Sequence, residues 1–153
     1  MKIAIGSDHG GYELKNELMS FLTGEGYTVK DFGTHSKESC DYPLIGFEVG
    51  KVVSDGKYER GILLCKTGVG MVIIANKLHG VRAVACYSEE LARLSREHND
   101  CNILVLAAAY TDLESAKKIA KAWLVTGHEG NRHARRVSQI RELEQRLKKE
   151  SVL

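Results

Sequence analysis

The segment at residues 65–70, Cys-Lys-Thr-Gly-Val-Gly, places a thiol and a hydroxyl beside two glycines. A thiolate can act as a base or a nucleophile, and glycines allow an anionic ligand to approach the backbone amides closely. The segment at residues 7–11, Ser-Asp-His-Gly-Gly, adds a carboxylate and an imidazole in front of a similar glycine pair. The two segments therefore carry groups that could bind an anion and transfer a proton.

These residues also have purely structural interpretations. Cysteine is among the most frequently buried residues, so this stretch alone favours a packed thiol at Cys65. Asp8 is typical of helix caps, and His9 could be an exposed side chain. Neither glycine segment completes a nucleotide motif: residues 68–73 lack the third glycine of a dinucleotide fingerprint, and Tyr12 stands where a P-loop has lysine. The glycines alone are compatible with simple tight turns.

The pattern of apolar residues predicts the elements that must position these groups. Short aliphatic and β-branched runs indicate buried strands at 2–7, 27–32, 60–65, 81–86 and 102–107. Apolar residues at helical spacing indicate helices at 13–26, 41–56, 68–78, 88–100 and 111–127. Strict alternation of strand and helix predicts one α/β domain, residues 1–153, with a doubly wound, five-stranded parallel sheet covered by helices on both faces.

A further helix, at about 132–149, has no strand of its own to cover. Its apolar residues Val137, Ile140, Leu143 and Leu147 form one stripe. We expect this stripe to pack on a partner subunit.

The composition limits the classes of partner. In 153 residues, Lys and Arg number 22 and Asp and Glu number 20, a net charge of +2 that does not indicate a nucleic-acid or anionic-membrane partner. The first residues do not resemble a signal peptide, and no apolar stretch is long enough for a membrane span, so we expect a cytoplasmic protein. The cysteines at 40, 65, 86 and 101 contain no C-x-x-C pair, which argues against a zinc site or a disulfide framework. We expect reduced thiols and neither metal nor cofactor.

Both chemical segments fall at predicted strand ends. In open parallel sheets ligands bind at the carboxyl ends of the strands, so Asp8, His9 and Cys65 are expected to share one site. Cys65 precedes a helix start and Lys66, an environment that favours a reactive thiol. Cys86 ends what we expect to be a neighbouring strand and is interpreted as a packing residue.

The combination of "GSDHGGYELK", "DFGT", "DYP", "GILLCKTGVGM", "LSREHNDCNIL" and "RHARRV" resembles the ribose-5-phosphate isomerase B family, which includes galactose-6-phosphate isomerase subunits. The resemblance covers nearly the whole chain. It implies a Rossmann-like fold, a homodimer or a dimer of dimers, and no metal. It also implies reversible aldose–ketose isomerisation of a small phosphorylated sugar.

The resemblance assigns roles by position. Cys65 would be the base that moves a proton between C1 and C2, and Thr67 would handle the oxygen-bound proton. His98 would open the furanose ring with Asp8 nearby. The remaining binding groups would be the backbone amides of Lys66, Gly68, Val69 and Gly70 for the cis-enediolate, Tyr42 and Asn99 for sugar hydroxyls, and His9, Arg132 and Arg136 for the phosphate. Independently, Arg132 and Arg136 stand four apart on a predicted helix and so face one way, which suits either phosphate binding or a solvated basic face.

Three positions depart from the family pattern. Lys66 stands where the family usually has glycine, and Ala109 stands where relatives commonly have an arginine that contributes to phosphate binding. Asn131 replaces the second glycine of the usual Gly-Gly-Arg-His. Because of these departures, other substrates remain alternatives to ribose 5-phosphate: allose or galactose 6-phosphate, or a tetrose phosphate. A non-catalytic phosphate-binding module is a further alternative, since such sheets host many functions.

Topology separates the predicted site residues. His98 and Asn99 follow a helix and precede the strand at 102–107, so they belong at the amino edge of the sheet, opposite Asp8 and Cys65. A strand of five or six residues spans roughly 17–20 Å, too far for one subunit to join the two groups. A two-fold homodimer could do so, which predicts two composite sites. The sequence leaves open which subunit supplies Arg132 and Arg136.

Overall fold

The computed structural model of the protein describes residues 1–150, and the last three residues of the predicted domain, 151–153, lie outside this part. Five parallel strands form one sheet in the order β2-β1-β3-β5-β4. The strands are β1 (Lys2–Ser7), β2 (Thr28–Asp31), β3 (Arg60–Cys65), β4 (Ala83–Ala85) and β5 (Ile103–Ala107). The predicted strands and the parallel sheet are confirmed, although β2, β4 and β5 are shorter than the predicted ranges.

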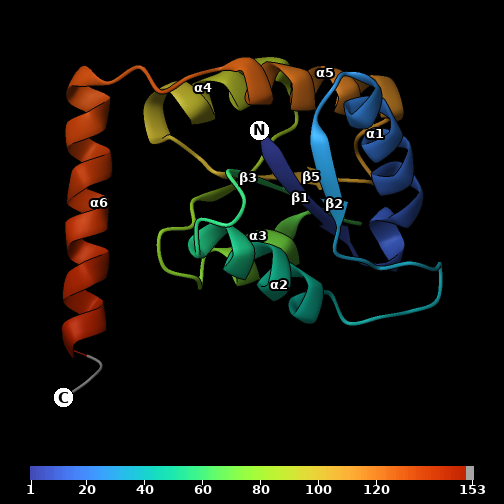
Figure 1. Cartoon of the computed structure of the whole chain (residues 1–153), viewed down its shortest axis with the longest axis horizontal. Helices are drawn as coiled ribbons and strands as arrows, with labels where there is room; N and C mark the ends of the chain where they lie inside the picture. The colour runs from blue at the N-terminus through green and yellow to red at the C-terminus, as the bar shows by residue number, and fades with distance from the viewer. Residues whose placement is uncertain (151–153) are drawn as a thin grey trace.

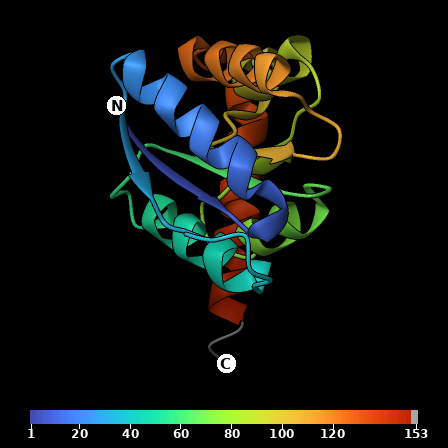
Figure 2. The same ribbon diagram turned by 90° about the vertical axis from the view of Figure 1, so that its right-hand side faces the viewer.

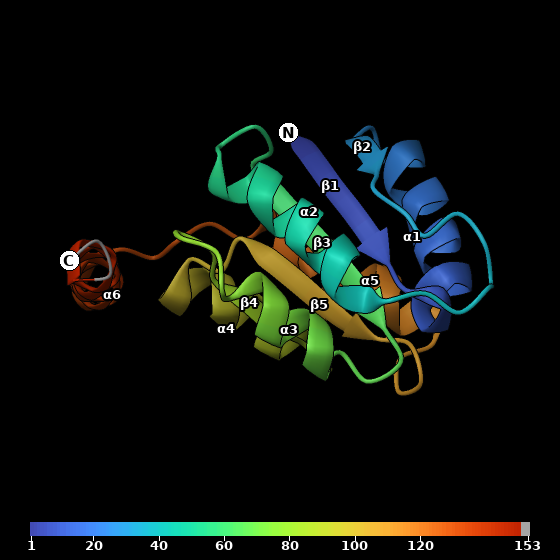
Figure 3. The ribbon, with the colours of Figure 1, turned by 90° about the horizontal axis from the view of Figure 1, so that it is seen from below.

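Helices cover both faces of the sheet, as expected (Figures 1 and 2). They are α1 (Tyr12–Gly24), α2 (Tyr42–Ser54), α3 (Val69–Ala75), α4 (Glu89–Asn99), α5 (Leu113–Val125) and α6 (Asn131–Glu150), with a 3₁₀ turn at His9–Gly11 before α1. The α1, α4 and α5 helices lie on one face, and α2 and α3 on the other, where Figure 3 shows them in front of the sheet. Right-handed crossovers require this division, because the chain moves across the sheet in one direction through α2 and α3 and in the other through α1 and α4.

Two apolar clusters fill the space between the sheet and its helices. One contains Leu18 of α1, Trp123 of α5 and side chains from β1, β3 and β5. The other contains Val49 of α2, Met71 of α3 and the opposite side chains of the same strands. Because both faces are buried, the central strands have continuous aliphatic sequences rather than alternating ones.

The strand order corrects one expectation. Cys86 follows β4, which is an edge strand, and β5 lies between β4 and β3. Cys86 therefore does not end a neighbour of the Cys65 strand. The order brings β1 and β3 together, and the chain leaves their ends toward opposite faces through α1 and α3. In parallel α/β sheets ligands bind at the carboxyl edge where the chain diverges in this way, and the two chemical segments lie there.

The turn after β1 is packed tightly against the end of β3. A Cβ atom on Gly11 would come within 2.8 Å of the Leu64 side chain and 2.9 Å of its backbone. A Cβ on Gly10 would come within 3.2 Å of the Lys66 backbone nitrogen and of Asp8 Oδ1. The glycine pair is thus needed to bring the two turns together, which is a packing reason beyond the tight-turn interpretation.

The loop between β2 and α2 is anchored by a buried lysine. The Lys15 side chain is fully buried, and its Nζ donates hydrogen bonds to both Asp31 carboxylate oxygens at 2.7 and 2.8 Å and to the Thr34 carbonyl at 2.6 Å. This loop leads to Cys40, whose amide donates to His9 Nδ1, and to Tyr42, whose ring lies against Gly70. Lys15 therefore connects the stability of α1 to the position of one wall of the site.

The C-terminal helix α6 stands apart from the body of the protein and is joined to α5 by an extended linker (Figure 1). Val137 is buried, whereas Ile140 and Leu143 remain exposed. Polar contacts fix the helix instead: Glu144 accepts from the Gly80 amide at 2.8 Å, and Arg141 pairs with Asp100 at 3.2 Å. Most of the apolar stripe is thus left uncovered within one chain.

No helix within residues 1–150 is long and apolar enough to cross a membrane.

The Lys15 contacts lead to a stability prediction. Replacing Lys15 by Met leaves the Asp31 carboxylate without its ammonium partner, and we expect the free energy of unfolding to fall by about 3 kcal/mol in urea titrations. The matched control is Lys37→Met, which removes an exposed ion pair with Glu13 and should leave the unfolding midpoint nearly unchanged. Equal effects of the two substitutions would contradict the anchoring role of Lys15.

Candidate active site

The thiol of Cys65 lies at the end of β3, beneath the turn that leads into α3. Its Sγ accepts a hydrogen bond from the Gly68 amide at 3.1 Å. Gly68 has a φ of +79°, a left-handed conformation that favours glycine, and this conformation turns its N–H back toward the sulfur. Thr67 Oγ1 lies within 3.4 Å of the Val69 amide, and the Thr67 side chain is exposed. The turn thus directs the Gly68 N–H at the thiol and the Val69 N–H at the Thr67 hydroxyl.

The turn is held by the strand next to it. The Cys65 carbonyl accepts from the Ala108 amide at 2.9 Å, and the Lys66 carbonyl accepts from the Ala109 amide at 3.0 Å. These bonds extend the pairing of β3 with β5 beyond the strands themselves. The backbone of the thiol turn is therefore fixed independently of any ligand.

Asp8 and His9 lie at the same edge of the sheet, directly after β1. The Asp8 carboxylate caps the 3₁₀ turn, because its Oδ1 accepts from the Gly10 and Gly11 amides at 2.9 and 3.2 Å. The capping interpretation of Asp8 is thus confirmed, and it leaves the other carboxylate oxygen available. His9 Nδ1 accepts from the Cys40 amide at 3.2 Å, so the proton of a neutral ring is on Nε2.

Tyr42 completes this wall from the first residue of α2. A Cβ on Gly70 would come within 2.6 Å of the Tyr42 ring, so the aromatic ring lies directly on the glycine. Gly70 and Val69 open α3, and Val69 is exposed. The structure therefore brings together these predicted residues at the carboxyl edge: Asp8, His9, Tyr42, Cys65, Lys66, Thr67, Gly68, Val69 and Gly70.

Two further thiols, Cys86 and Cys101, are buried away from the Cys65 turn. All four cysteines are free, as expected. Burial raises the pKa of Cys86 to about 11, and burial also raises the pKa of Cys101 to about 11. Neither thiol is suited to act as a base near neutral pH, because the thiolate is the reactive form. The packing interpretation of Cys86 is consistent with its complete burial in the core.

The remaining predicted residues lie at the opposite edge of the sheet. His98 and Asn99 end α4, just before β5, and the Asn99 carbonyl accepts from Arg82 Nε ahead of β4. The register pairs Cys65 with Ala107 at the far end of β5, while β5 begins at Ile103. In Figure 3 the arrowheads of β1 and β5 point away from α6, the helix that carries Arg132 and Arg136. Within one chain, His98 and Asn99 therefore lie at the edge of the sheet opposite to Asp8 and Cys65, as the topology predicted.

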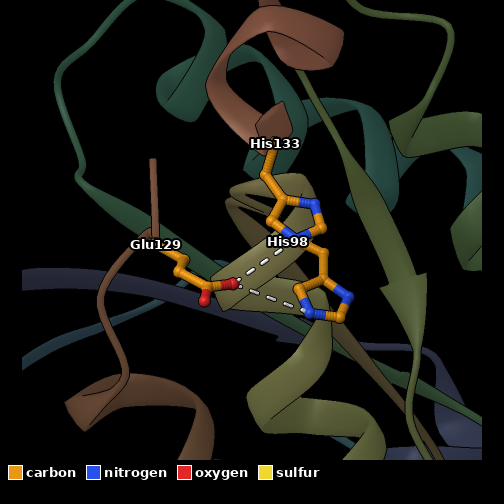
Figure 4. A group of neighbouring side chains, drawn as sticks. All are labelled: His98, Glu129 and His133. Carbon is orange, nitrogen blue, oxygen red and sulfur yellow. Dashed lines mark ion pairs between the residues drawn. The ribbon is translucent and has the colours of Figure 1, made fainter. Parts of the chain in front are cut away.

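A cluster that the sequence did not single out surrounds His98. The imidazole of His133, from the first turn of α6, stacks on His98 with ring centroids 4.1 Å apart and planes at 8°. Glu129 Oε2 lies 3.4 Å from His133 Nε2 and 3.8 Å from His98 Nε2 (Figure 4). Arg132 Nε donates to His133 Nε2 at 3.5 Å, which places this arginine at the same edge as His98. The sequence could not predict this cluster, because its members come from three separate segments: α4, the linker and α6.

The cluster has the ligand types of a metal site but not the geometry. One ligand atom from each of His98, Glu129 and His133 lies within 4.8 Å of the others. However, the lone pairs of imidazole nitrogens lie in the ring planes, and two nearly parallel stacked planes do not direct them at a shared ion about 2.1 Å away. The neighbouring guanidinium of Arg132 also disfavours a bound cation.

Comparison with known proteins places the chain in a family. A family model described as Ribose/Galactose Isomerase matches residues 3–140. The chain belongs to this family. It is 47% identical to ribose-5-phosphate isomerase B of Escherichia coli over 145 residues, which cover 95% of this chain and 97% of that protein.

Two solved structures of the family are also similar to the protein. Ribose-5-phosphate isomerase B of Clostridium thermocellum has a TM-score of 0.93 and 50% identity, covering 96% of this chain and 99% of that one. The enzyme from Mycoplasma genitalium, solved with bound ribulose-5-phosphate, has a TM-score of 0.91 and 36% identity, covering 94% of this chain and 96% of that one. The resemblance seen in the sequence motifs is thereby confirmed.

The structure relates the three departures from the family pattern to local geometry. Lys66 and Ala109 are neighbours, joined by a backbone hydrogen bond at 3.0 Å. Lys66 is exposed, and within residues 1–150 its ammonium has no hydrogen-bond or ion-pair partner. Asn131 has a φ of +52°, a left-handed conformation that asparagine adopts more readily than most residues other than glycine. The third departure is therefore compatible with the same backbone.

Proposed function

We propose that the protein interconverts ribose 5-phosphate and ribulose 5-phosphate, with Cys65 as the base. The observation that carries the proposal is the Cys65 thiol in a turn of backbone amides at the carboxyl edge of the sheet. Family membership supports the same reaction, since relatives at 47% and 36% identity are ribose-5-phosphate isomerases, one of them solved with ribulose-5-phosphate.

The proton transfer needs one base and one anion-stabilising turn. The Cys65 thiolate takes the C2 proton of the open-chain aldose, and the C–H electron pair forms the C1–C2 double bond while negative charge develops on O1. Backbone N–H groups of residues 66–70 stabilise this cis-enediolate. The thiol then returns the proton to C1, and Thr67 moves the O2 proton to O1, which yields the ketose. The reaction consumes no oxidant, so it needs no redox cofactor.

Ring opening and phosphate binding use groups from both edges of the sheet. His98 transfers a proton at the ring oxygen of the furanose, with Asp8 near the anomeric hydroxyl. Tyr42 and Asn99 bind sugar hydroxyls. The phosphate is bound by His9, through its Nε2–H, together with Arg132 and Arg136.

The separation of the two edges supports a homodimer with composite sites, or a dimer of such dimers. Each site would combine Asp8, His9 and Cys65 of one chain with His98 and Asn99 of the partner subunit. Arg132 contacts His133, which stacks on His98, so the arginines accompany His98 rather than Cys65. The exposed residues Ile140 and Leu143 of α6 provide an apolar face for the partner.

We place this enzyme in the cytoplasm, where free thiols such as Cys65 stay reduced.

A substrate panel tests the proposed reaction. Four-, five- and six-carbon sugar phosphates are assayed for aldose–ketose interconversion without added metal, and we expect the highest kcat/KM for the five-carbon pair. A preference for a tetrose or hexose phosphate would assign a sister activity to the protein. Binding of all the sugars without turnover would favour the phosphate-binding module instead.

The role of Cys65 is tested by hydrogen exchange. Cys65→Ala should lower the entry of solvent deuterium into C1 of ribulose 5-phosphate by about 10²–10⁴-fold, because loss of a general base has effects of this size. Cys86→Ala is the matched control and should retain exchange, since Cys86 packs in the apolar cluster on the face of the sheet opposite to that of Cys65. Equal loss in both variants, or full exchange in Cys65→Ala, would refute the assignment.

The composite site is tested by subunit exchange. Cys65→Ala and His98→Asn homodimers should each turn over ribose 5-phosphate very slowly. Mixed dimers contain one intact site, so statistical exchange should restore about a quarter of the wild-type activity. Exchange is followed by mass spectrometry of the intact dimers. Demonstrated mixed dimers without activity would mean that His98 acts within its own chain or not at all.

A further inference from the structure

The carboxylate of Glu129 faces the edge of the His98 imidazole. Glu129 Oε2 lies 3.8 Å from His98 Nε2 (Figure 4). The His98 side chain is 37% exposed and lies at the end of a helix. An imidazole in such a position can adopt several rotamers unless neighbouring groups hold it.

Backbone contacts fix Glu129 relative to the last turn of α4. The Glu129 amide donates to the Glu97 carbonyl at 3.0 Å, and His128 Nδ1 lies 2.9 Å from the same oxygen. Glu97 directly precedes His98. The linker between α5 and α6 is therefore attached to the helical turn that carries His98, and the carboxylate stays beside the ring.

His133 supports the opposite side of the arrangement. Its side chain is buried, and its ring covers one face of His98 with planes at 8°. Burial lowers the pKa of His133, and the neighbouring His98 and Arg132 charges lower that pKa further. His133 is thus neutral at neutral pH and already accepts from Arg132 through Nε2. The Glu129 carboxylate lies beside both rings, with its Oε2 3.4 Å from His133 Nε2 and 3.8 Å from His98 Nε2.

We propose that Glu129 and His133 are positioning residues that hold the His98 imidazole in the orientation needed to open the sugar ring. The Glu129 carboxylate orients the edge of the His98 ring that carries Nε2, and His133 fixes the plane of the ring. Neither residue contacts the sugar; both act through His98. The proposal rests on the proposed function, since it assumes that His98 catalyses ring opening. It adds two residues to the group from which each composite site is built.

The test separates ring opening from proton transfer. Ribulose 5-phosphate cannot close a five-membered ring, because its C5 oxygen carries the phosphate. Deuterium exchange at its C1 therefore needs Cys65 but no ring-opening group. Glu129→Gln should lower the turnover of ribose 5-phosphate by about 10–10²-fold and change the exchange rate of ribulose 5-phosphate less than about twofold, since a displacement of a catalytic group by about 1 Å can cost about 10²-fold. His133→Ala should show the same selectivity, with partial recovery in His133→Phe, which restores a flat ring.

Two further variants make the outcome decisive. Glu97→Gln removes an equal charge one residue from His98, but the Glu97 side chain pairs with Arg93 and not with the imidazoles; its activity should match the wild type. His98→Asn gives the two rates expected when ring opening is lost completely.

If His98→Asn lowers only the turnover of ribose 5-phosphate and Glu129→Gln does not share this selectivity, the positioning role is wrong while the proposed function stands. A non-selective His98→Asn would refute the ring-opening role and the positioning role together. Equal loss of both rates in Glu129→Gln would show a structural effect and would also overturn the proposal.

Discussion

The length of a parallel strand is the constraint on which the rest of this structure depends. All five strands run in one direction, so the turns that follow them lie at one edge and the turns that precede them lie at the other. The Cys65 thiol sits beside the end of β5, while His98 sits before its start. The interior between them is closely packed aliphatic core. No side-chain movement within one chain can bridge that distance, so joining the two groups requires a second chain.

The packing at each edge of the sheet reflects the separation of the two groups of turns. At the carboxyl edge, Gly10 and Gly11 let the first turn approach β3, and the left-handed Gly68 directs an amide at the thiol. At the amino edge, the linker that carries Glu129 is bonded to the end of α4, and the α6 helix is held by polar contacts. Ile140 and Leu143 of the α6 stripe are exposed in the isolated chain. The same topology that splits the site thus leaves an apolar surface free for the subunit that would complete it.

Local patterns predicted much of this arrangement, and non-local contacts escaped them. The strand at 60–65 is confirmed, because its short aliphatic run depends only on residues that are neighbours in sequence. The strand order is different: β5 lies between β3 and β4, and no local propensity encodes which strands pair. For the same reason the prediction that Cys86 ends a strand next to β3 is wrong. The cluster of His98, Glu129 and His133 depends on how α6 returns to α4, a contact between segments about thirty residues apart that no spacing rule describes.

A crystal structure of the protein with ribulose 5-phosphate would test the split site most directly. Our account predicts that C1 and C2 of the sugar lie within about 3.5 Å of Cys65 Sγ, a reactive separation, with His98 of the partner subunit on the same ligand. A sugar bound entirely by residues of one chain, with His98 remote from it in both subunits, would contradict the account.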